Sequence, residues 1–276
     1  MPLDYSALVW IALALAIVFV FIRKNIAAFI SLGITLILAI LFSRLTLPTG
    51  LVVGVVLVGT WKLSRIAPRY ALPSALVVIA CCLALFIHKV PGFDNLLVLN
   101  QVITGPQSQP FTMYLNLDKP LALFILLLAY PKLLGNGGTP NHKAIALTAI
   151  ALFCLLPIAV LIGALKFEWS LPAWWWLFAF NNLLFTCVAE EALFRGYLQQ
   201  KLANKLGVVA GIGIASILFG LAHFAGGPLL VIFAALTGLG YGLIFYWSQR
   251  LWVAVLAHFA FNCIHLLCFT YPIALH

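Results

Sequence analysis

Acidic side chains are scarce in this chain, which has six Asp and Glu residues among 276. Lys and Arg together number fifteen, and charged residues make up only 8% of the sequence. Hydrophobic residues make up 65%, and the mean hydropathy is +1.16. So few charges cannot cover a water-exposed surface, and the composition therefore excludes an ordinary water-soluble protein. The expected fold class is all-α, a polytopic bundle of transmembrane helices that forms a single membrane domain.

Other absences exclude further classes of protein. The basic residues are scattered between apolar runs and form no long cationic block, so no nucleic-acid partner is expected. The six cysteines form no CxxC pair and lie inside apolar runs, which argues against both a zinc knuckle and a disulfide framework. The N-terminus lacks the basic segment that begins a signal peptide, so the first apolar run is expected to remain as a membrane span.

Ten apolar segments follow one another along the chain, at residues 7–22, 26–42, 45–61, 71–87, 121–134, 144–165, 172–200, 208–224, 228–247 and 251–270. Several are shorter than the roughly 20 residues that cross a bilayer comfortably, so about eight to ten membrane spans are expected. The segments at 45–61 and 121–134 are the weakest candidates, and the first of these contains Pro48 and Gly50.

The basic residues predict which loops share a side of the membrane. If all ten segments span, one side carries eleven basic residues, namely Arg23, Lys24, Lys62, Arg65, Arg69, Lys132, Lys143, Arg195, Lys201, Lys205 and Arg250. The other side carries four, namely Arg44, Lys89, Lys119 and Lys166. This excess marks the first side as cytoplasmic. The long connection at 88–120 contains Pro, Gly, Asn and Gln and is then expected to be a loop outside the cytoplasm.

Two adjacent carboxylates, Glu190 and Glu191, lie at the end of a long apolar run. An ionisable side chain at membrane depth is costly unless it has a partner or faces a wet cavity, so this pair is expected to be functional. On a helix that rises about 1.5 Å per residue, Glu190 lies roughly 16 Å from Lys201, well inside the bilayer. The same geometry places His223 and His258 in the middle band, and the three titratable groups can meet if their helices pack together.

Helix geometry predicts different roles for the two glutamates. Consecutive residues are rotated by about 100° around an α-helix, so Glu190 and Glu191 cannot both point into one small cavity. Glu191 and Arg195 are spaced i,i+4 and are expected to form an ion pair, which could also serve only to hold helices together. Glu190 is then expected to face the site. Asn262 lies one helical turn from His258 and shares its face.

A carboxylate, two imidazoles and a carboxamide in a low-dielectric cavity are suited to activating water. Glu190 can accept a proton from a water molecule that His223 also holds. His258 and Asn262 can both donate hydrogen bonds to a tetrahedral oxyanion. These residue types therefore predict hydrolysis of an amide bond.

A metal centre is an alternative use of the same residues, because Glu190, His223 and His258 could ligate zinc from three helices. The chain has no HExxH motif, and a carboxamide is an uncommon zinc ligand. A glutamate and a histidine can activate water unaided, so no catalytic metal and no other cofactor is expected.

The polar residues also form three ordered motifs, each on its own expected span: EEALFR at 190–195, FGLAH at 219–223 and HFAFN at 258–262. They resemble the motifs EExxxR, FxxxH and HxxxN of the CAAX protease and bacteriocin-processing (CPBP) family of intramembrane endopeptidases. Each motif alone is weak evidence, whereas the three in order form a specific signature. The resemblance covers roughly residues 171–270.

The resemblance implies an intramembrane endopeptidase. In it, Glu190 and His223 would activate water, and His258 and Asn262 would stabilise the oxyanion. The resemblance also implies that Glu191 and Arg195 are a supporting pair. Eukaryotic members of the family remove the last three residues of prenylated CAAX proteins, but many bacterial relatives have other substrates. The expected partner is therefore a membrane-anchored or lipid-modified protein, in a multi-pass enzyme of a bacterial plasma membrane. Residues 171–276 would be the catalytic core, and residues 1–170 N-terminal transmembrane helices of unknown role.

Two other functions remain open. A proton-coupled transporter could use Glu190 and the histidines as a relay, although such proteins usually carry matched polar sites in two repeated halves, and here the polar residues are confined to one half. A catalytically silent immunity or scaffold protein could keep the same fold. The intact motifs argue against this last possibility.

Overall fold

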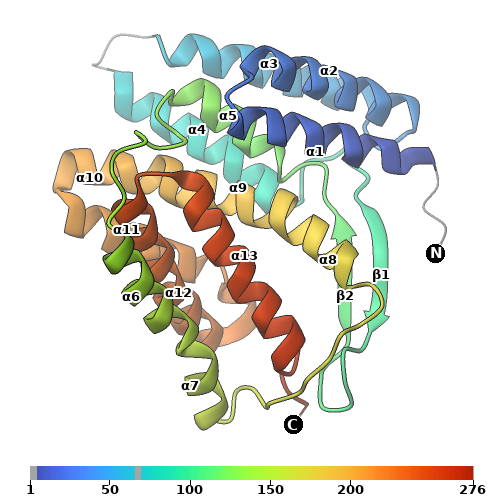
Figure 1. The fold of residues 1–276 in the computed structure, drawn as a ribbon. Helices are drawn as coiled ribbons and strands as arrows, with labels where there is room; N and C mark the ends of the chain where they lie inside the picture. Colours follow the sequence, from blue (N-terminus) through green and yellow to red (C-terminus); the bar gives the residue numbers. More distant parts are fainter. Residues whose placement is uncertain (1–4, 66–69, 276) are drawn as a thin grey trace. The chain divides into compact units, whose positions relative to one another are not determined.

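The computed structural model describes residues 5–65 and 70–275 and is predominantly helical, as the composition predicted (Figure 1). The chain forms two compact units. The first consists of the described residues up to Val98 with Met113–Pro131 and Leu184–Ala189, and the second consists of Leu99–Thr112, Lys132–Leu183 and the chain from Glu190 onward.

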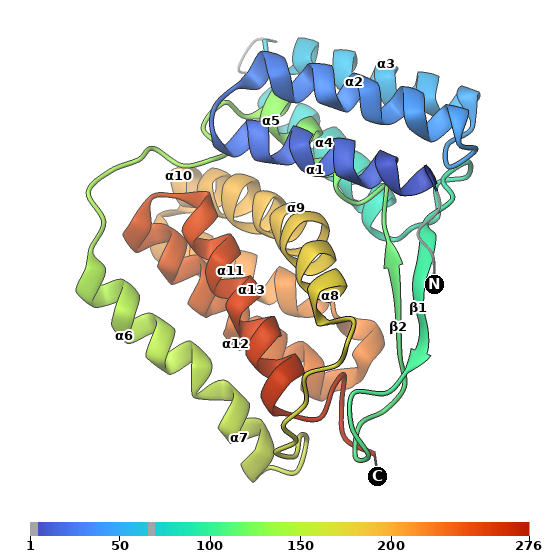
Figure 2. The same ribbon diagram turned by 45° about the vertical axis from the view of Figure 1, so that its right-hand side comes forward.

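The first unit is built from short apolar helices. They are α1 (Leu8–Phe21), α2 (Asn25–Leu41), α3 (Leu47–Leu63), α4 (Ala71–Phe86) and α5 (Leu121–Ala129). Helix α1 packs against α2, and both views show the two side by side (Figures 1 and 2). Helix α5 packs against α3 and α4, which explains why its side chains are buried.

The two weakest predicted spans differ in outcome. Helix α3 forms over 17 residues, because Pro48 falls in its first turn, where a backbone N–H has no helical partner to lose. Helix α5 has only nine residues, and its Leu121 and Phe124 side chains are 0% exposed. Nine residues rise about 14 Å, less than half of a hydrocarbon core, so α5 by itself is too short to cross a membrane.

The long connection after α4 is more regular than predicted. It contains two strands, β1 (Leu96–Val102) and β2 (Phe111–Leu115), which pair in a two-stranded sheet. Both strands are rich in β-branched, aromatic and large apolar residues, whereas Pro106 and Pro110 fall between them. The Pro, Gly and polar residues that predicted a loop therefore mark the turn and not the whole connection.

The second unit contains α6 (His142–Phe153), α7 (Leu155–Leu161), a long helix at Trp175–Leu206, α11 (Val208–Leu221), α12 (Gly227–Ser248) and α13 (Leu251–Cys268). Helix α12 packs against α6, α11 and α13. The long helix contacts α11, α12 and α13 through its second half. This packing brings the three motif-bearing segments together (Figures 1 and 2).

The long helix is not a uniform α-helix. It consists of α8 (Trp175–Asn181), a π-helical segment (Asn182–Cys187), α9 (Val188–Glu191), a second π-helical segment (Ala192–Gln199) and α10 (Gln200–Leu206). A π-helix is rare, widens the helix and is frequently found at functional sites. Both glutamates of the first motif lie in the short α-helical stretch between the two π-helical segments.

Four described helices are long and apolar enough to cross a membrane: His142–Leu161, Trp175–Leu206, Phe224–Ser248 and Leu251–Cys268. Five shorter apolar helices of 10–17 residues are Tyr5–Phe21, Asn25–Leu41, Leu47–Leu63, Ala71–Phe86 and Val208–Leu221. These helices support the prediction of an integral membrane protein. The count of eight to ten spans stays a prediction.

Loops predicted to share the cytoplasmic side lie at one end of the second unit. In the connection 132–141, the Gly137 N–H donates a hydrogen bond to the Gln249 carbonyl at 3.0 Å. The Leu251 N–H donates to the Leu134 carbonyl, also at 3.0 Å. The connection that precedes α6 is therefore joined to the link between α12 and α13.

Glu168 joins three segments at the opposite end of α13, where its N–H donates to the Cys268 carbonyl at 3.1 Å. Its carboxylate accepts a hydrogen bond from the Gln107 N–H at 2.8 Å and another from the Ser108 hydroxyl. The Ser108 hydroxyl in turn accepts from the Tyr271 N–H at 2.9 Å. The connection 88–120 and Lys166 were both predicted to lie outside the cytoplasm, and that orientation stays a prediction.

Candidate active site

Glu191 and Arg195 form a buried ion pair, as their spacing predicted. Arg195 Nη1 lies 2.8 Å from Glu191 Oε1, and both side chains are 0% exposed. Arg195 Nη2 donates to the Gly238 carbonyl of α12 at 2.9 Å. The guanidinium carbon also lies 4.4 Å from the Phe219 ring centroid and 5.2 Å from that of Tyr241. The pair therefore connects the long helix to α11 and α12.

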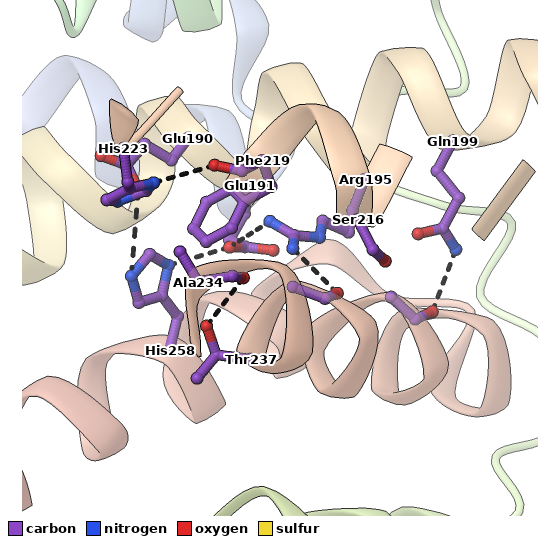
Figure 3. Close-up of polar contacts among 12 residues, drawn as sticks. Glu190, Glu191, Arg195, Gln199, Ser216, Phe219, His223, Ala234, Thr237 and His258 are labelled. Carbon is purple, nitrogen blue, oxygen red and sulfur yellow. Dashed lines mark hydrogen bonds and ion pairs between the residues drawn. The ribbon is translucent and has the colours of Figure 1, made fainter. Parts of the chain in front are cut away.

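His258 of α13 lies between the two glutamates (Figure 3). Its Nδ1 is 2.8 Å from Glu191 Oε1, and its Nε2 is 3.9 Å from Glu190 Oε2. A carboxylate that is paired with Arg195 can only accept, so Nδ1 carries the hydrogen and donates it to Glu191. Nε2 is then the nitrogen that faces Glu190. At 3.9 Å, one oxygen atom of water or substrate can contact both groups.

The contact between Glu191 and His258 was not predicted, because the sequence analysis gave Glu191 only Arg195 as a partner. An imidazole has nitrogens on two edges, so two carboxylates can flank one ring without pointing into the same cavity. Glu190 is 8% exposed and Glu191 0% exposed, so both carboxylates are buried.

His223 lies just beyond the last residue of α11, in the turn before α12. Its Nδ1 donates to the Phe219 carbonyl at 2.8 Å, so Nε2 is the nitrogen that can accept a proton. The Phe219 ring centroid lies 4.8 Å from that of His223 and 5.8 Å from that of His258. Phe219 therefore contacts both histidines, and Figure 3 shows His223 at the Glu190 end of the cluster.

Asn262 is held by a residue that the sequence analysis missed. Its Nδ2 donates to Asn182 Oδ1 at 3.2 Å, across the interface between α13 and the first π-helical segment. Asn182 is 8% exposed, whereas Asn262 is half-buried. The available signal was a carboxamide inside an apolar helix, eight residues before Glu190. The contact fixes the orientation of the Asn262 amide.

Tyr241 is a second residue that no motif indicated. Its ring stacks on that of His258, with centroids 4.5 Å apart and an interplanar angle of 16°. It is 1% exposed and also lies edge-on to Phe219 at 6.1 Å. The stacked ring covers one face of the imidazole, while Glu191 holds Nδ1. The orientation of His258 is therefore set from two directions.

Glu190, His223 and His258 were named from the sequence as the possible ligands of a zinc ion. Among residues 5–65 and 70–275, no group of three or more His, Cys, Asp or Glu side chains is placed to hold a metal ion. The 3.9 Å between Glu190 Oε2 and His258 Nε2 is compatible with a shared water molecule. No chemical step is assigned to a metal here.

The comparisons with known proteins agree with the three motifs. Residues 172–264 match the family model described as type II CAAX prenyl endopeptidase Rce1-like. This part of the chain is similar to Rce1-like CAAX proteases. The match confirms the predicted resemblance, includes all three motifs and covers about a third of the chain. Neither a curated protein nor a solved structure gives a significant match.

The Rce1-like match supports a protease, and the apolar helices support an integral membrane protein. The matched segment includes the long helix, α11, the turn with His223, α12 and most of α13, which together supply all of the site residues described above. The first unit contributes Leu184–Ala189 to the matched range, and its other helices lie outside it.

Proposed function

We propose that this protein is an intramembrane endopeptidase that hydrolyses a peptide bond of a membrane-anchored or lipid-modified protein. One observation carries the proposal: His258 is held by Glu191 at Nδ1 and faces Glu190 with Nε2, 3.9 Å away. A purely structural ion pair between Glu191 and Arg195 needs no such imidazole. The Rce1-like match supports the same conclusion.

In the proposed mechanism, Glu190 is the general base. It accepts a proton from a water molecule that His223 Nε2 helps to hold, and the water oxygen attacks the carbonyl carbon of the scissile peptide bond. The attack produces a tetrahedral oxyanion. The burial of Glu190 matters because a low-dielectric surrounding strengthens every hydrogen bond made to the reacting atoms.

The oxyanion is stabilised by donors from α13. Asn262 donates from Nδ2, and protonated His258 donates from Nε2 while the Glu191 carboxylate balances the positive charge of the imidazolium. Glu190 then gives its proton to the leaving nitrogen, the C–N bond breaks, and a carboxylic acid and an amine are released; the acid afterwards passes its proton to the amine or to water. No metal takes part in this scheme.

The substrate class follows from the match and from the composition. The matched family is named for prenyl endopeptidases, and a site on apolar helices is reached most directly by a substrate that is itself held in the bilayer. We propose a prenylated or otherwise membrane-associated protein as substrate, in a bacterial plasma membrane that the enzyme crosses several times.

The test compares newly formed C-termini of membrane proteins in cells that express the wild-type protein and in cells that express Glu190→Gln. The proposal predicts at least one terminus that appears only with the wild type, and the shifted terminus identifies the substrate. Glu168→Gln serves as a control, because it removes a buried carboxylate outside the site. Identical termini in the wild type and Glu190→Gln would contradict proteolysis and favour the scaffold or transporter alternatives.

A further inference from the structure

Besides Asn181 Oδ1, three buried polar atoms on the long helix have no hydrogen-bond partner among the residues that the structure describes. They are Glu191 Oε2, Arg195 Nε and Gln199 Oε1. Glu191 and Arg195 are 0% exposed, and Gln199 is 4% exposed. Buried polar atoms are almost always hydrogen-bonded, either to protein or to ordered water. These atoms therefore indicate a bound partner that is not a side chain.

The three residues are spaced four positions apart in the sequence, so they lie along one side of the helix. The helix rises about 6 Å from each of them to the next. Figure 3 shows their side chains in a row that begins beside His258 and ends at Gln199. Ser216 belongs to α11, which packs against this part of the long helix. The row carries one polar side chain at each helical turn. It leads from the catalytic histidine toward the end of the helix that carries Lys201.

Hydrogen bonds from other atoms of Arg195 and Gln199 hold these two side chains in place. Arg195 Nη2 donates to the Gly238 carbonyl, and Gln199 Nε2 donates to the Gly242 carbonyl one turn further along α12, both at 2.9 Å. A Cβ atom at position 242 would lie 2.7 Å from Gln199 Oε1, so glycine is needed for this close approach. The side chains cannot rotate toward other partners without losing these bonds.

The chemistry of the three atoms selects the partner. Two are acceptors, a carboxylate oxygen and a carboxamide oxygen, and one is a guanidinium N–H donor. A water molecule can donate twice and accept, so water suits all three. A cation would be repelled by Arg195 and an anion by Glu191, and an apolar molecule would leave all three atoms unsatisfied.

We propose that Glu191, Arg195 and Gln199 bind a short file of internal water molecules, which connects the Lys201 end of the long helix to the Glu191–His258 pair. Because Glu191 also accepts the hydrogen bond from His258 Nδ1, the file ends one hydrogen bond from the imidazole. It allows the Nδ1 proton of His258 to exchange with the aqueous phase through Glu191. The use of this exchange in catalysis rests on the function proposed above, whereas the water binding does not.

The test is solid-state nuclear magnetic resonance of the full-length protein in lipid bilayers, with water-to-protein polarisation transfer detected at ¹⁵N-labelled Arg195 Nε. In the wild type, transfer to this buried nitrogen should be about as fast as transfer to the half-exposed Arg250 Nε, because ordered water contacts it. Transfer to Arg195 that is slow enough to be undetectable would overturn the proposal.

A substitution at the outer end of the row tests the route. Gln199→Met has a similar length but no oxygen, so transfer to Arg195 Nε should slow by about tenfold when the waters that bridge from this end are lost. Gln200→Met is the matched control, since Gln200 donates to the Gly196 and Lys132 carbonyls at 2.6 and 3.1 Å and lies outside the row. Unchanged transfer in Gln199→Met would overturn a route from this end.

A second variant covers the case in which Gln199→Met fails to fold. Ser216→Val narrows the row from α11 and replaces a hydroxyl that bonds only within its own helix, to the Ile212 carbonyl at 2.7 Å. It should slow the transfer in the same way, and unchanged transfer counts against the proposal. These measurements need no substrate, so their failure differs from a failure of proteolysis, which Glu190→Gln tests separately.

Discussion

At the scale of single residues, the site centres on His258, which is oriented by contacts from three other segments. Glu191 holds Nδ1, Tyr241 covers one face, and Phe219 contacts the ring edge-on at 5.8 Å. Only the Nε2 edge faces Glu190. An imidazole held in this way loses little freedom when substrate binds, which is the physical advantage of a preorganised site.

Glu191→Gln should lower stability and turnover together. The substitution removes the charge that balances buried Arg195, and breaking one partner of a buried ion pair typically costs about 3–5 kcal/mol. A fall in the melting temperature in detergent of roughly 5 °C or more is expected, along with a lower kcat because His258 loses its carboxylate partner. An unchanged melting temperature with lost activity would mean that the roles of the two glutamates are reversed.

Substitutions of Tyr241 should separate ring stacking from the hydroxyl group. Tyr241→Phe keeps the ring on His258 and should retain kcat within about twofold, whereas Tyr241→Leu removes the stacked face and should lower kcat by about tenfold, equivalent to about 1.4 kcal/mol. The measurement is kcat and KM for each purified variant. Equal losses in both variants would show that the ring face does not position His258.

At the scale of elements, the site depends on close contact between α11 and α12, which holds Phe219 and Tyr241 together. Gly220 permits this contact, because a Cβ atom there would lie 2.6 Å from the Val231 carbonyl oxygen and 2.7 Å from Ala235 Cβ. Backbone atoms cannot move aside cheaply, so even one methyl group forces the two helices apart.

Gly220→Ala should therefore reduce the melting temperature and the activity, with a destabilisation of about 1–3 kcal/mol. Gly213→Ala is the matched control in the same helix, because a Cβ atom there meets nothing within 4 Å. The control should be neutral or slightly stabilising, since Ala favours a helix more than Gly does. Equal melting temperatures for the two variants would contradict the packing described for α11 and α12.

Some of these elements could be predicted from the sequence, because they depend on local spacing. The i,i+4 interval predicted the Glu191–Arg195 pair, and the apolar runs predicted helices close to those observed in the second unit. The π-helical segments, the Asn182–Asn262 contact and the stacking of Tyr241 on His258 could not be predicted. The last two join segments that are far apart in the chain, and a single sequence does not indicate which distant segments will pack together.

At the scale of the whole molecule, the described part of the chain divides into two units, and nearly all of the Rce1-like match falls in the second. At one end of that unit, the connection before α6 is bonded to the link between α12 and α13, and both carry basic residues. At the other end, Glu168 is bonded to Gln107 and to the residue that ends α13. The charge pattern predicts the same grouping, and the orientation in the membrane stays a prediction. The two-stranded sheet in the long connection was not predicted, since its Pro and Gly residues were taken to mark an irregular loop.

The predicted orientation can be tested by labelling single cysteines with a membrane-impermeant maleimide, after replacing the six native cysteines with alanine. Lys143→Cys should react only when the cytoplasmic face is exposed, and Lys166→Cys should react in intact cells, because both side chains are exposed at opposite ends of the second unit. Labelling of both positions from the same face would contradict the assignment of spans.

The central claim is that buried Glu190 is the base that activates water for peptide hydrolysis, and turnover of Glu190→Gln in proteoliposomes tests it most directly. The variant keeps the size of the side chain but cannot accept the proton, so cleavage should fall by at least about 10³-fold at an unchanged melting temperature, within the range that loss of an essential catalytic group causes. Turnover within about tenfold of the wild type by a correctly folded variant would contradict the account.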